Sequence, residues 1–285
     1  MRAVRLQQRV GPAGGGHPAE HAEVRRLRPG RLRGRVALIT GGGGGIGEAT
    51  GRLFAEEGAS LALVDASAEA VQSTAKAIAG AVESARVLPL VADVSREDET
   101  RRVVADVLAH YGALHCLVNV AGVRVYQPLA AASAEDWQTI LGVNVLGTAY
   151  CCKAAIPALR AVGGGTIVNV SSVYGVMGRK GMGQYDTTKA AVLGMTRALA
   201  AEEAPHGIRV NAVCPGSTIT PYHIRRAAAQ GQSEAELRQR TAGENLLGRW
   251  AEPREIAYPI LFLACEESSY ITGATLMVDA GKSIV

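Results

Sequence analysis

From residue 35 onward, short apolar runs alternate with longer stretches whose apolar residues recur at helical spacing. The short runs predict buried β-strands at 35–40, 60–65, 86–92, 114–119, 165–171, 208–213 and 274–278. The stretches between them predict helices at 46–57, 67–80, 96–111, 134–161, 184–203 and 254–265. Continuous apolar strands alternating with helices are typical of a parallel sheet covered on both faces.

This alternation predicts an α/β fold, a Rossmann-like doubly wound parallel sheet of about seven strands with helices on both faces. About seven strand–helix repeats fill residues 31–285, so we expect a single domain there. An eight-unit barrel is the competing topology. The first strand–turn–helix unit favours the open sheet, because its turn has the composition of a nucleotide-binding loop.

That turn is rich in glycine, with six glycines among residues 41–47. Glycines permit positive φ angles and let the backbone approach a pyrophosphate, whose oxygens the free N–H groups of the next helix can bind. A glycine run alone is weak evidence, but a strand precedes this one and a helix follows it. The residues expected to contact a dinucleotide are Gly41, Gly44, Gly45, Ile46 and Gly47.

An acid follows at the end of the second strand. Asp65, 18 residues past Gly47, could accept hydrogen bonds from both hydroxyls of an adenosine ribose and would repel a 2′-phosphate. No Arg or Lys stands in the glycine turn or just after Asp65 to bind such a phosphate. The pattern therefore predicts NAD rather than NADP. The alternative is that Asp65 merely caps the next helix, although Ser67 can serve there instead.

Candidate catalytic residues lie downstream, in Tyr185-Asp-Thr-Thr-Lys189. Residues four apart share a helix face, so the phenol and the ammonium can point into one pocket. A tyrosine has a reference pKa near 10, and a nearby cation lowers it toward the range of a useful proton acceptor. Ser172, at the end of a strand 13 residues earlier, could hold a substrate oxygen. The alternatives are a surface Tyr–Lys pair and a serine that caps a turn.

Together and in this order, these motifs resemble the short-chain dehydrogenase/reductase family, in its branch with one Rossmann domain. The resemblance covers residues 31–285 and rests on Thr-Gly-x-x-x-Gly-Ile-Gly and Tyr-x-x-x-Lys. It implies that Asn144, Ser172, Tyr185 and Lys189 are catalytic. Besides Tyr185 and Lys189, it implies further cofactor contacts from Asp93, Val94, Asn119, Ala121, Pro215, Gly216, Thr218 and Thr220. The chain departs from the family at Val120, where a second Asn is usual, and at Ala280, where Gly is usual.

The resemblance implies hydride transfer between NAD(H) and a secondary alcohol or ketone. Tyr185 would accept the alcohol proton, Lys189 would lower the tyrosine pKa, and Ser172 would hold the substrate oxygen. Asn144 would complete a proton relay through water. Two alternatives are kept: an epimerase or dehydratase that retains NAD, and a non-catalytic nucleotide-binding protein.

The region 221–249 is the expected substrate lid, because it lies between a cofactor loop and the next helix. Arg124, Arg179 and Lys180 lie in other loops expected near the site and could bind a carboxylate. Solvated loop charge or a subunit contact is the favoured interpretation of all three.

Charge is distributed unevenly along the chain. The net charge is +4, yet residues 1–35 carry nine Arg against two Glu, and the remainder carries 21 basic against 24 acidic side chains. We expect residues 1–30 to be a disordered basic tail or to follow from a start site assigned too far upstream, and we expect no nucleic-acid partner.

No run approaches the length of a membrane helix, so no membrane span is expected. Five cysteines without a C-x-x-C pair indicate buried thiols, no metal site and a cytoplasmic protein. The family resemblance implies a homo-oligomer, a dimer or tetramer.

Overall fold

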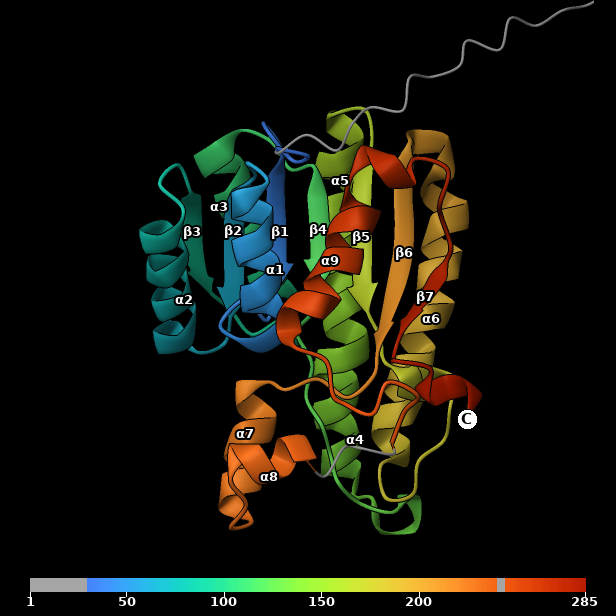
Figure 1. The fold of residues 1–285 in the computed structure, drawn as a ribbon. Helices are drawn as coiled ribbons and strands as arrows, with labels where there is room; N and C mark the ends of the chain where they lie inside the picture. The colour runs from blue at the N-terminus through green and yellow to red at the C-terminus, as the bar shows by residue number, and fades with distance from the viewer. Residues whose placement is uncertain (1–29, 240–243) are drawn as a thin grey trace, which may run out of the picture.

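The computed structural model describes residues 30–239 and 244–285, so the tail predicted for residues 1–30 lies outside the described residues except for Gly30. Seven parallel strands form one sheet in the order β3-β2-β1-β4-β5-β6-β7 (Figure 1). Its strands are β1 (Val36–Thr40), β2 (Ser60–Asp65), β3 (Arg86–Val91), β4 (Cys116–Asn119), β5 (Gly165–Val170), β6 (Ile208–Pro215) and β7 (Thr275–Val278). The predicted Rossmann-like sheet is confirmed, and its open edges at β3 and β7 exclude the barrel.

Helices cover both faces of the sheet. One face carries α1 (Gly45–Glu56), α2 (Ala68–Ala81) and α9 (Pro253–Ala264). The other carries α3 (Glu97–Tyr111), α5 (Thr148–Ala161) and α6 (Gly183–Glu203). Beyond the carboxyl edge of the strands lie α4 (Ala134–Leu141), α7 (Pro221–Ala229) and α8 (Glu234–Gln239) (Figure 1). Single 3₁₀ turns lie at Leu129–Ala131, Val173–Gly175, Ala204–His206, Glu266–Ser268 and Lys282–Ile284.

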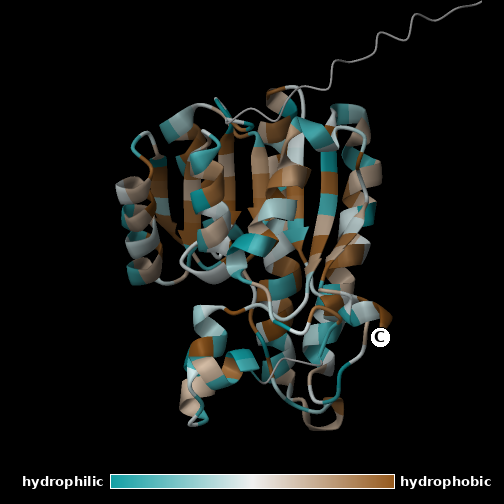
Figure 2. Cartoon of the chain, in the orientation of Figure 1, coloured by the Kyte–Doolittle hydropathy of each residue, from teal (hydrophilic) through white to brown (hydrophobic). Residues whose placement is uncertain are grey.

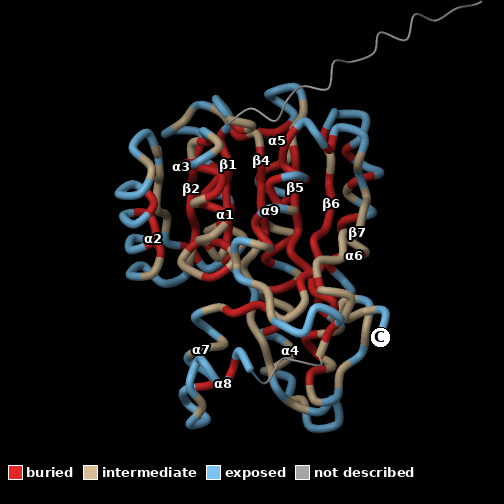
Figure 3. Tube along the Cα trace, in the orientation of Figure 1, coloured by how far each residue is buried: buried red, intermediate tan, exposed pale blue. Residues whose placement is uncertain are grey.

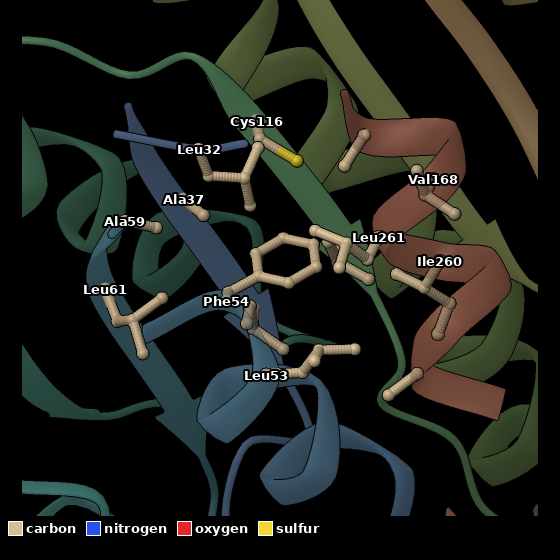
Figure 4. Close-up of a cluster of buried hydrophobic side chains, with 14 of the residues drawn as sticks. Leu32, Ala37, Leu53, Phe54, Ala59, Leu61, Cys116, Val168, Ile260 and Leu261 are labelled. Atoms are coloured by element: carbon tan, nitrogen blue, oxygen red, sulfur yellow. The ribbon is translucent and has the colours of Figure 1, made fainter. Parts of the chain in front are cut away.

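The central strands β1, β2, β4, β5 and β6 are mostly apolar because both of their faces are buried, whereas the edge strands β3 and β7 are only partly buried (Figures 2 and 3). Under α1 and α9, the ring of Phe54 is fully buried and lies among Leu53, Leu261 and Ile260 (Figure 4). Alternate residues of the same strands face the layer on the opposite side, as Leu38 does beside Ile39.

The helix predicted at 134–161 is interrupted. A π-helical turn, Gly142–Gly147, separates α4 from α5, and such turns occur mostly at functional sites. Gly147, the last residue of this turn, packs closely on the loop that follows β3. A Cβ on Gly147 would lie 2.9 Å from Val94 Cγ2.

Judged by length and composition alone, the stretch Ala134–Ala161 is long and apolar enough to cross a membrane. This corrects the expectation that no segment of the chain is. In this fold 39% of its most apolar window is buried. Its α5 part packs against α3, β4 and β5, so it is placed here as a core helix of an α/β sheet.

The crevice for a ligand is set by strand order. The chain crosses from β1 to β2 on one side, and β4 then pairs on the other side of β1, with Thr40 opposite Asn119. Helices leaving these two strands go to opposite faces, and ligands of doubly wound sheets bind at such a switch point.

Candidate active site

The glycine turn packs tightly against its surroundings at every glycine except Gly44. Gly41 has a φ of +65°, and a Cβ on it would lie 2.9 Å from the backbone nitrogen of Ala121. A Cβ on Gly47 would lie only 2.0 Å from the carbonyl oxygen of Gly41. Gly45 has a φ of +56° and faces Thr220. The backbone can therefore turn directly from β1 into α1 only with glycine at these positions.

The first turn of α1 is available to an anion. Gly44 is its N-cap, and no side chain of the described residues caps the helix. A Cβ on Gly44 would meet nothing within 4 Å. The first backbone N–H groups, from Gly45 to Gly47, therefore point out of the fold without an intrahelical partner. These features fit the pyrophosphate of a dinucleotide.

Asp65 lies at the end of β2 and contacts the glycine turn directly. Its Oδ2 accepts a hydrogen bond from the Gly43 N–H at 3.0 Å, and its Oδ1 accepts one from the Ser67 N–H at 3.0 Å. The N-cap of α2 is Ser67, whose Oγ accepts from the Ala70 N–H at 3.2 Å. Asp65 is therefore not the helix cap, and its carboxylate is placed beside the turn.

The loop after β3 carries the next two expected cofactor residues. Asp93 Oδ1 accepts hydrogen bonds from the N–H and the hydroxyl of Ser95, at 2.9 and 2.8 Å. Val94 is buried against Gly147. These contacts shape the loop at the crevice.

The loop after β4 is tied to β1 through one hydroxyl. Thr40 Oγ1 accepts hydrogen bonds from the N–H groups of Val120 and Ala121, at 3.1 and 3.2 Å. The Val120 side chain packs on the apolar core, where the family has an asparagine. Polar support for the sheet comes from Asn119, whose Nδ2 donates to Asn169 Oδ1 at 2.9 Å.

Tyr185, Lys189 and Ser172 come together as predicted, and all three are buried. α6 begins at Gly183, so the tyrosine and the lysine lie one turn apart. Lys189 Nζ donates to the carbonyl of Val170 at 2.9 Å and lies 5.7 Å from the centre of the Tyr185 ring. The second serine, Ser171, donates instead to the Lys189 carbonyl at 2.8 Å.

Electrostatics prepare the phenol to lose its proton. Burial by itself raises the pKa of Tyr185, but the positive charges of Lys189 and Arg124 outweigh it. Hydrogen bonds from Ser172 and Arg124 add to the effect, so the Tyr185 pKa lies below its usual 10. Burial in turn lowers the pKa of Lys189, the phenolate form of Tyr185 opposes this, and the charge of Arg124 lowers the pKa further. A buried phenol of this kind can accept a proton from an alcohol.

Asn144 reaches the site from the π turn. Its Oδ1 accepts from the Val123 N–H at 2.8 Å, and its Nδ2 donates to the Val123 carbonyl and to Thr188 Oγ1, both at 3.0 Å. Gly122 passes between Asn144 and the lysine, since a Cβ there would lie 3.3 Å from Oδ1 and 3.4 Å from Lys189 Nζ. The amide therefore anchors the loop after β4, a role that sequence reasoning missed.

The loop after β6 closes the crevice from the other side. Gly216 approaches Asp279 so closely that a Cβ would lie 2.8 Å from the aspartate Cα. Thr218 bridges to Ala251, and the Thr220 hydroxyl contacts His223 Nδ1 at 2.9 Å. The cofactor-binding residues expected in this loop thus lie beside α1 and at the start of the lid.

The expected lid, 221–249, consists of α7 and α8, with residues 240–243 outside the described part of the chain. The three cations that sequence reasoning treated alike have different places. Lys180 is exposed. Arg179 stacks on the ring of Tyr174 at 3.6 Å, and its N–H donates to Asp186 at 2.8 Å.

Arg124 is no solvated loop charge, which corrects the favoured interpretation. Its guanidinium carbon lies 5.2 Å from the centre of the Tyr185 ring and 5.5 Å from that of Tyr222. Its Nη1 donates to His223 Nε2. Sequence reasoning missed His223, whose only sequence signal is its place one helical turn after Thr220.

The comparisons with known proteins agree with this geometry. A family model described as enoyl-(acyl carrier protein) reductase matches residues 42–283. The chain belongs to the short-chain dehydrogenase/reductase family. It is 40% identical over 255 residues to 3-oxoacyl-[acyl-carrier-protein] reductase FabG of Thermotoga maritima, which covers 89% of this chain and 100% of the relative.

Other members of the family act on small alcohols by name. Meso-2,3-butanediol dehydrogenase of Serratia marcescens is 36% identical over 253 residues, which are 89% of this chain and 96% of that protein. The crystal structure of carveol dehydrogenase from Mycobacterium avium in complex with NAD superposes with a TM-score of 0.83 at 29% identity, covering 90% of this chain and 100% of that one. These likenesses show an oxidoreductase of this family.

Proposed function

We propose that residues 31–285 form one catalytic unit that transfers a hydride between NAD(H) and a secondary alcohol or its ketone. The observation that carries this proposal is the burial of the Tyr185 phenol between Lys189 and Ser172 at the carboxyl edge of the sheet. The glycine turn and Asp65 lie at the same edge. A proton acceptor is thus held next to a crevice suited to a dinucleotide.

In the oxidation direction, Tyr185 accepts the hydroxyl proton of the alcohol at its phenolate oxygen. The ammonium of Lys189 stabilises that phenolate, and the phenolate in turn raises the Lys189 pKa against the lowering by burial. Ser172 Oγ donates a hydrogen bond to the substrate oxygen as charge develops there. NAD, when bound, supplies the acceptor for the hydride that leaves the carbinol carbon.

The residues that would hold the cofactor fit NAD. The N–H groups of the first α1 turn would bind the pyrophosphate, and Asp65 would accept from the ribose hydroxyls. The carveol dehydrogenase whose structure holds NAD supports the same choice. The ratio of kcat/KM with NAD to that with NADP tests this, and a preference for NADP would overturn the role of Asp65.

A screen of secondary alcohols, followed at the NADH absorbance, tests the activity. With the alcohol that the screen identifies as a substrate, Tyr185→Phe should lower kcat/KM by about 10²- to 10⁴-fold. The affinity for NAD should change little. Tyr270→Phe is the matched control, because Tyr270 is fully exposed (relative exposure 103%) and should leave the rate unchanged. Substantial activity of Tyr185→Phe would refute the assignment.

The same screen separates the alternatives. An epimerase or dehydratase that retains NAD would form no net NADH. A non-catalytic nucleotide-binding protein would bind NAD and turn over nothing. Removing residues 1–30 tests a tail function, since nucleic-acid affinity lost with activity unchanged would indicate one.

We also propose that the chain assembles as a homo-oligomer, either a dimer or a tetramer. An apolar depression between α5 and α6 supports this, lined in part by Ala149, Ile156, Met195 and Leu199. Light scattering of the purified protein measures the assembly. A cytoplasmic location stays a prediction, and the five free cysteines are all buried as expected.

A further inference from the structure

Two cations of the active site, Lys189 and Arg124, lack the acidic partner that some other partly buried cations of the described residues have. Arg31, for example, pairs with Glu57 at 2.7 Å, and Lys282 pairs with Glu244 at 3.1 Å. Within the described part of the chain, Arg124 forms no ion pair. Its neighbours are aromatic rings and a histidine.

No carboxylate among the described residues pairs with Arg124. Burial works against its charged form, but the neighbouring tyrosines, Tyr185 first, outweigh burial, so the pKa of the guanidinium lies above its usual value. His223 is neutral. Burial, followed by the positive charges of Arg124 and Arg226, lowers the His223 pKa to about 3. A neutral His223 accepts from Arg124 at Nε2, which leaves its Nδ1 to carry the proton toward Thr220.

A second cation lies close by on the lid. Arg226 of α7 stacks on the ring of Tyr126 at 3.9 Å, and it too forms no ion pair among residues 30–239 and 244–285. Arg179, by contrast, has Asp186 beside it at 3.9 Å. Arg124 and Lys189 place positive charge beside the Tyr185 ring. A half-buried guanidinium without a carboxylate partner offers its planar donors to an anion of the substrate.

Resting on the proposed function, we propose that Arg124 binds a carboxylate of the substrate, so that this enzyme interconverts a short hydroxy acid and the corresponding keto acid. The alcohol carbon loses a hydride to NAD⁺ and its hydroxyl loses a proton to Tyr185, which yields the ketone and NADH. The carboxylate takes no part in bond changes. It is held by the planar guanidinium, which matches two carboxylate oxygens at once.

The position of Arg124 restricts the distance between the two substrate groups. The guanidinium carbon of Arg124 lies 5.2 Å from the centre of the Tyr185 ring, so we expect few bonds between the carboxylate and the reacting carbon, as in 2- and 3-hydroxy acids. His223 and Tyr222 contact the guanidinium from the lid helix α7.

The test compares acids with neutral analogues of the same shape. Lactate and 3-hydroxybutyrate, as both enantiomers, are assayed with NAD against their primary amides. A hydrogen-bonded carboxylate in place of a neutral amide should raise kcat/KM about 10- to 100-fold. In Arg124→Met this acid-to-amide ratio should fall to near one, and Arg124→Lys should keep part of it. Arg225→Met, an exposed neighbour on α7, should keep the full ratio.

The ratio also separates binding of an acid from an effect on catalysis. Arg124 helps to lower the Tyr185 pKa, so Arg124→Met should move the pH profile upward for acid and amide alike. That shift cancels in the ratio, whereas loss of a carboxylate contact does not. An unchanged ratio in Arg124→Met, or a wild-type enzyme that prefers the amides, would overturn the proposal.

A binding measurement covers the case in which neither compound reacts. Calorimetric titration of the Tyr185→Phe enzyme with NAD and each acid should show binding that Arg124→Met, added to it, weakens about 10-fold or more. Acid binding without turnover in the wild type would sustain the Arg124 site and refute the proposed hydride transfer. Turnover of neutral alcohols with no preference for acids would support the proposed hydride transfer and refute the Arg124 site.

Discussion

Gly47→Ala should disrupt the cofactor turn, although alanine is the better helix former. In an exposed helix this change would stabilise by about 1 kcal/mol. At Gly47 the new methyl would lie 2.0 Å from the Gly41 carbonyl oxygen and 2.7 Å from its carbon. A normal contact needs roughly 1 Å more separation between two backbone segments, and overpacking of this kind costs about 3 kcal/mol or more. The clash therefore outweighs the propensity gain.

Urea unfolding and the KM for NAD measure this effect. With an m-value near 3 kcal/mol/M, the unfolding midpoint should fall by about 0.7 M, and the KM should rise because α1 moves away from the turn. Gly44→Ala is the matched control for the unfolding measurement, because Gly44 has an extended backbone (φ 172°) and open space for a Cβ. The KM is compared with that of the wild type, because Gly44 is itself an expected cofactor contact. Equal stability of the two variants, or an unchanged KM in Gly47→Ala, would refute the reasoning.

Three further predictions follow from the structure. The rate of alcohol oxidation should rise with pH and level off below pH 10, because oxidation needs the phenolate and the Tyr185 pKa is lowered. Lys189→Met should move the inflection of this pH profile upward. An inflection at the same pH would contradict the role of the Lys189 charge. Phe54→Ala should destabilise by about 3–5 kcal/mol in a thermal melt because the ring is fully buried, whereas Phe262→Ala, at a 37% exposed side chain, should cost under about 1 kcal/mol. Ala280→Gly should raise the free energy of unfolding in urea by about 0.5–1 kcal/mol, because Ala280 has a φ of +55° and glycine removes that strain. A loss of stability would show that packing of the Ala280 methyl group matters more.

Local pattern was sufficient for the elements and the motifs. The predicted bounds of β2 and α6 differ from those in the structure by at most one residue, because strand and helix periods are properties of consecutive residues. The one-turn spacing of Tyr185 and Lys189 is equally local. Their common pocket followed from the period of a helix and from the rule that ligands bind at the carboxyl edge of a parallel sheet.

The tertiary structure decided what joins residues far apart in the chain. Only strand order brings the Asp65 carboxylate to the N–H of Gly43, 22 residues earlier, and only folding places Arg124 against His223, 99 residues later. In the sequence, Arg124 is hard to distinguish from the exposed Lys180, since each is a basic residue in a predicted loop. Burial and the neighbouring charges that determine a side chain's role are sums over the whole fold, and for that reason the pocket's positive end became visible only in three dimensions.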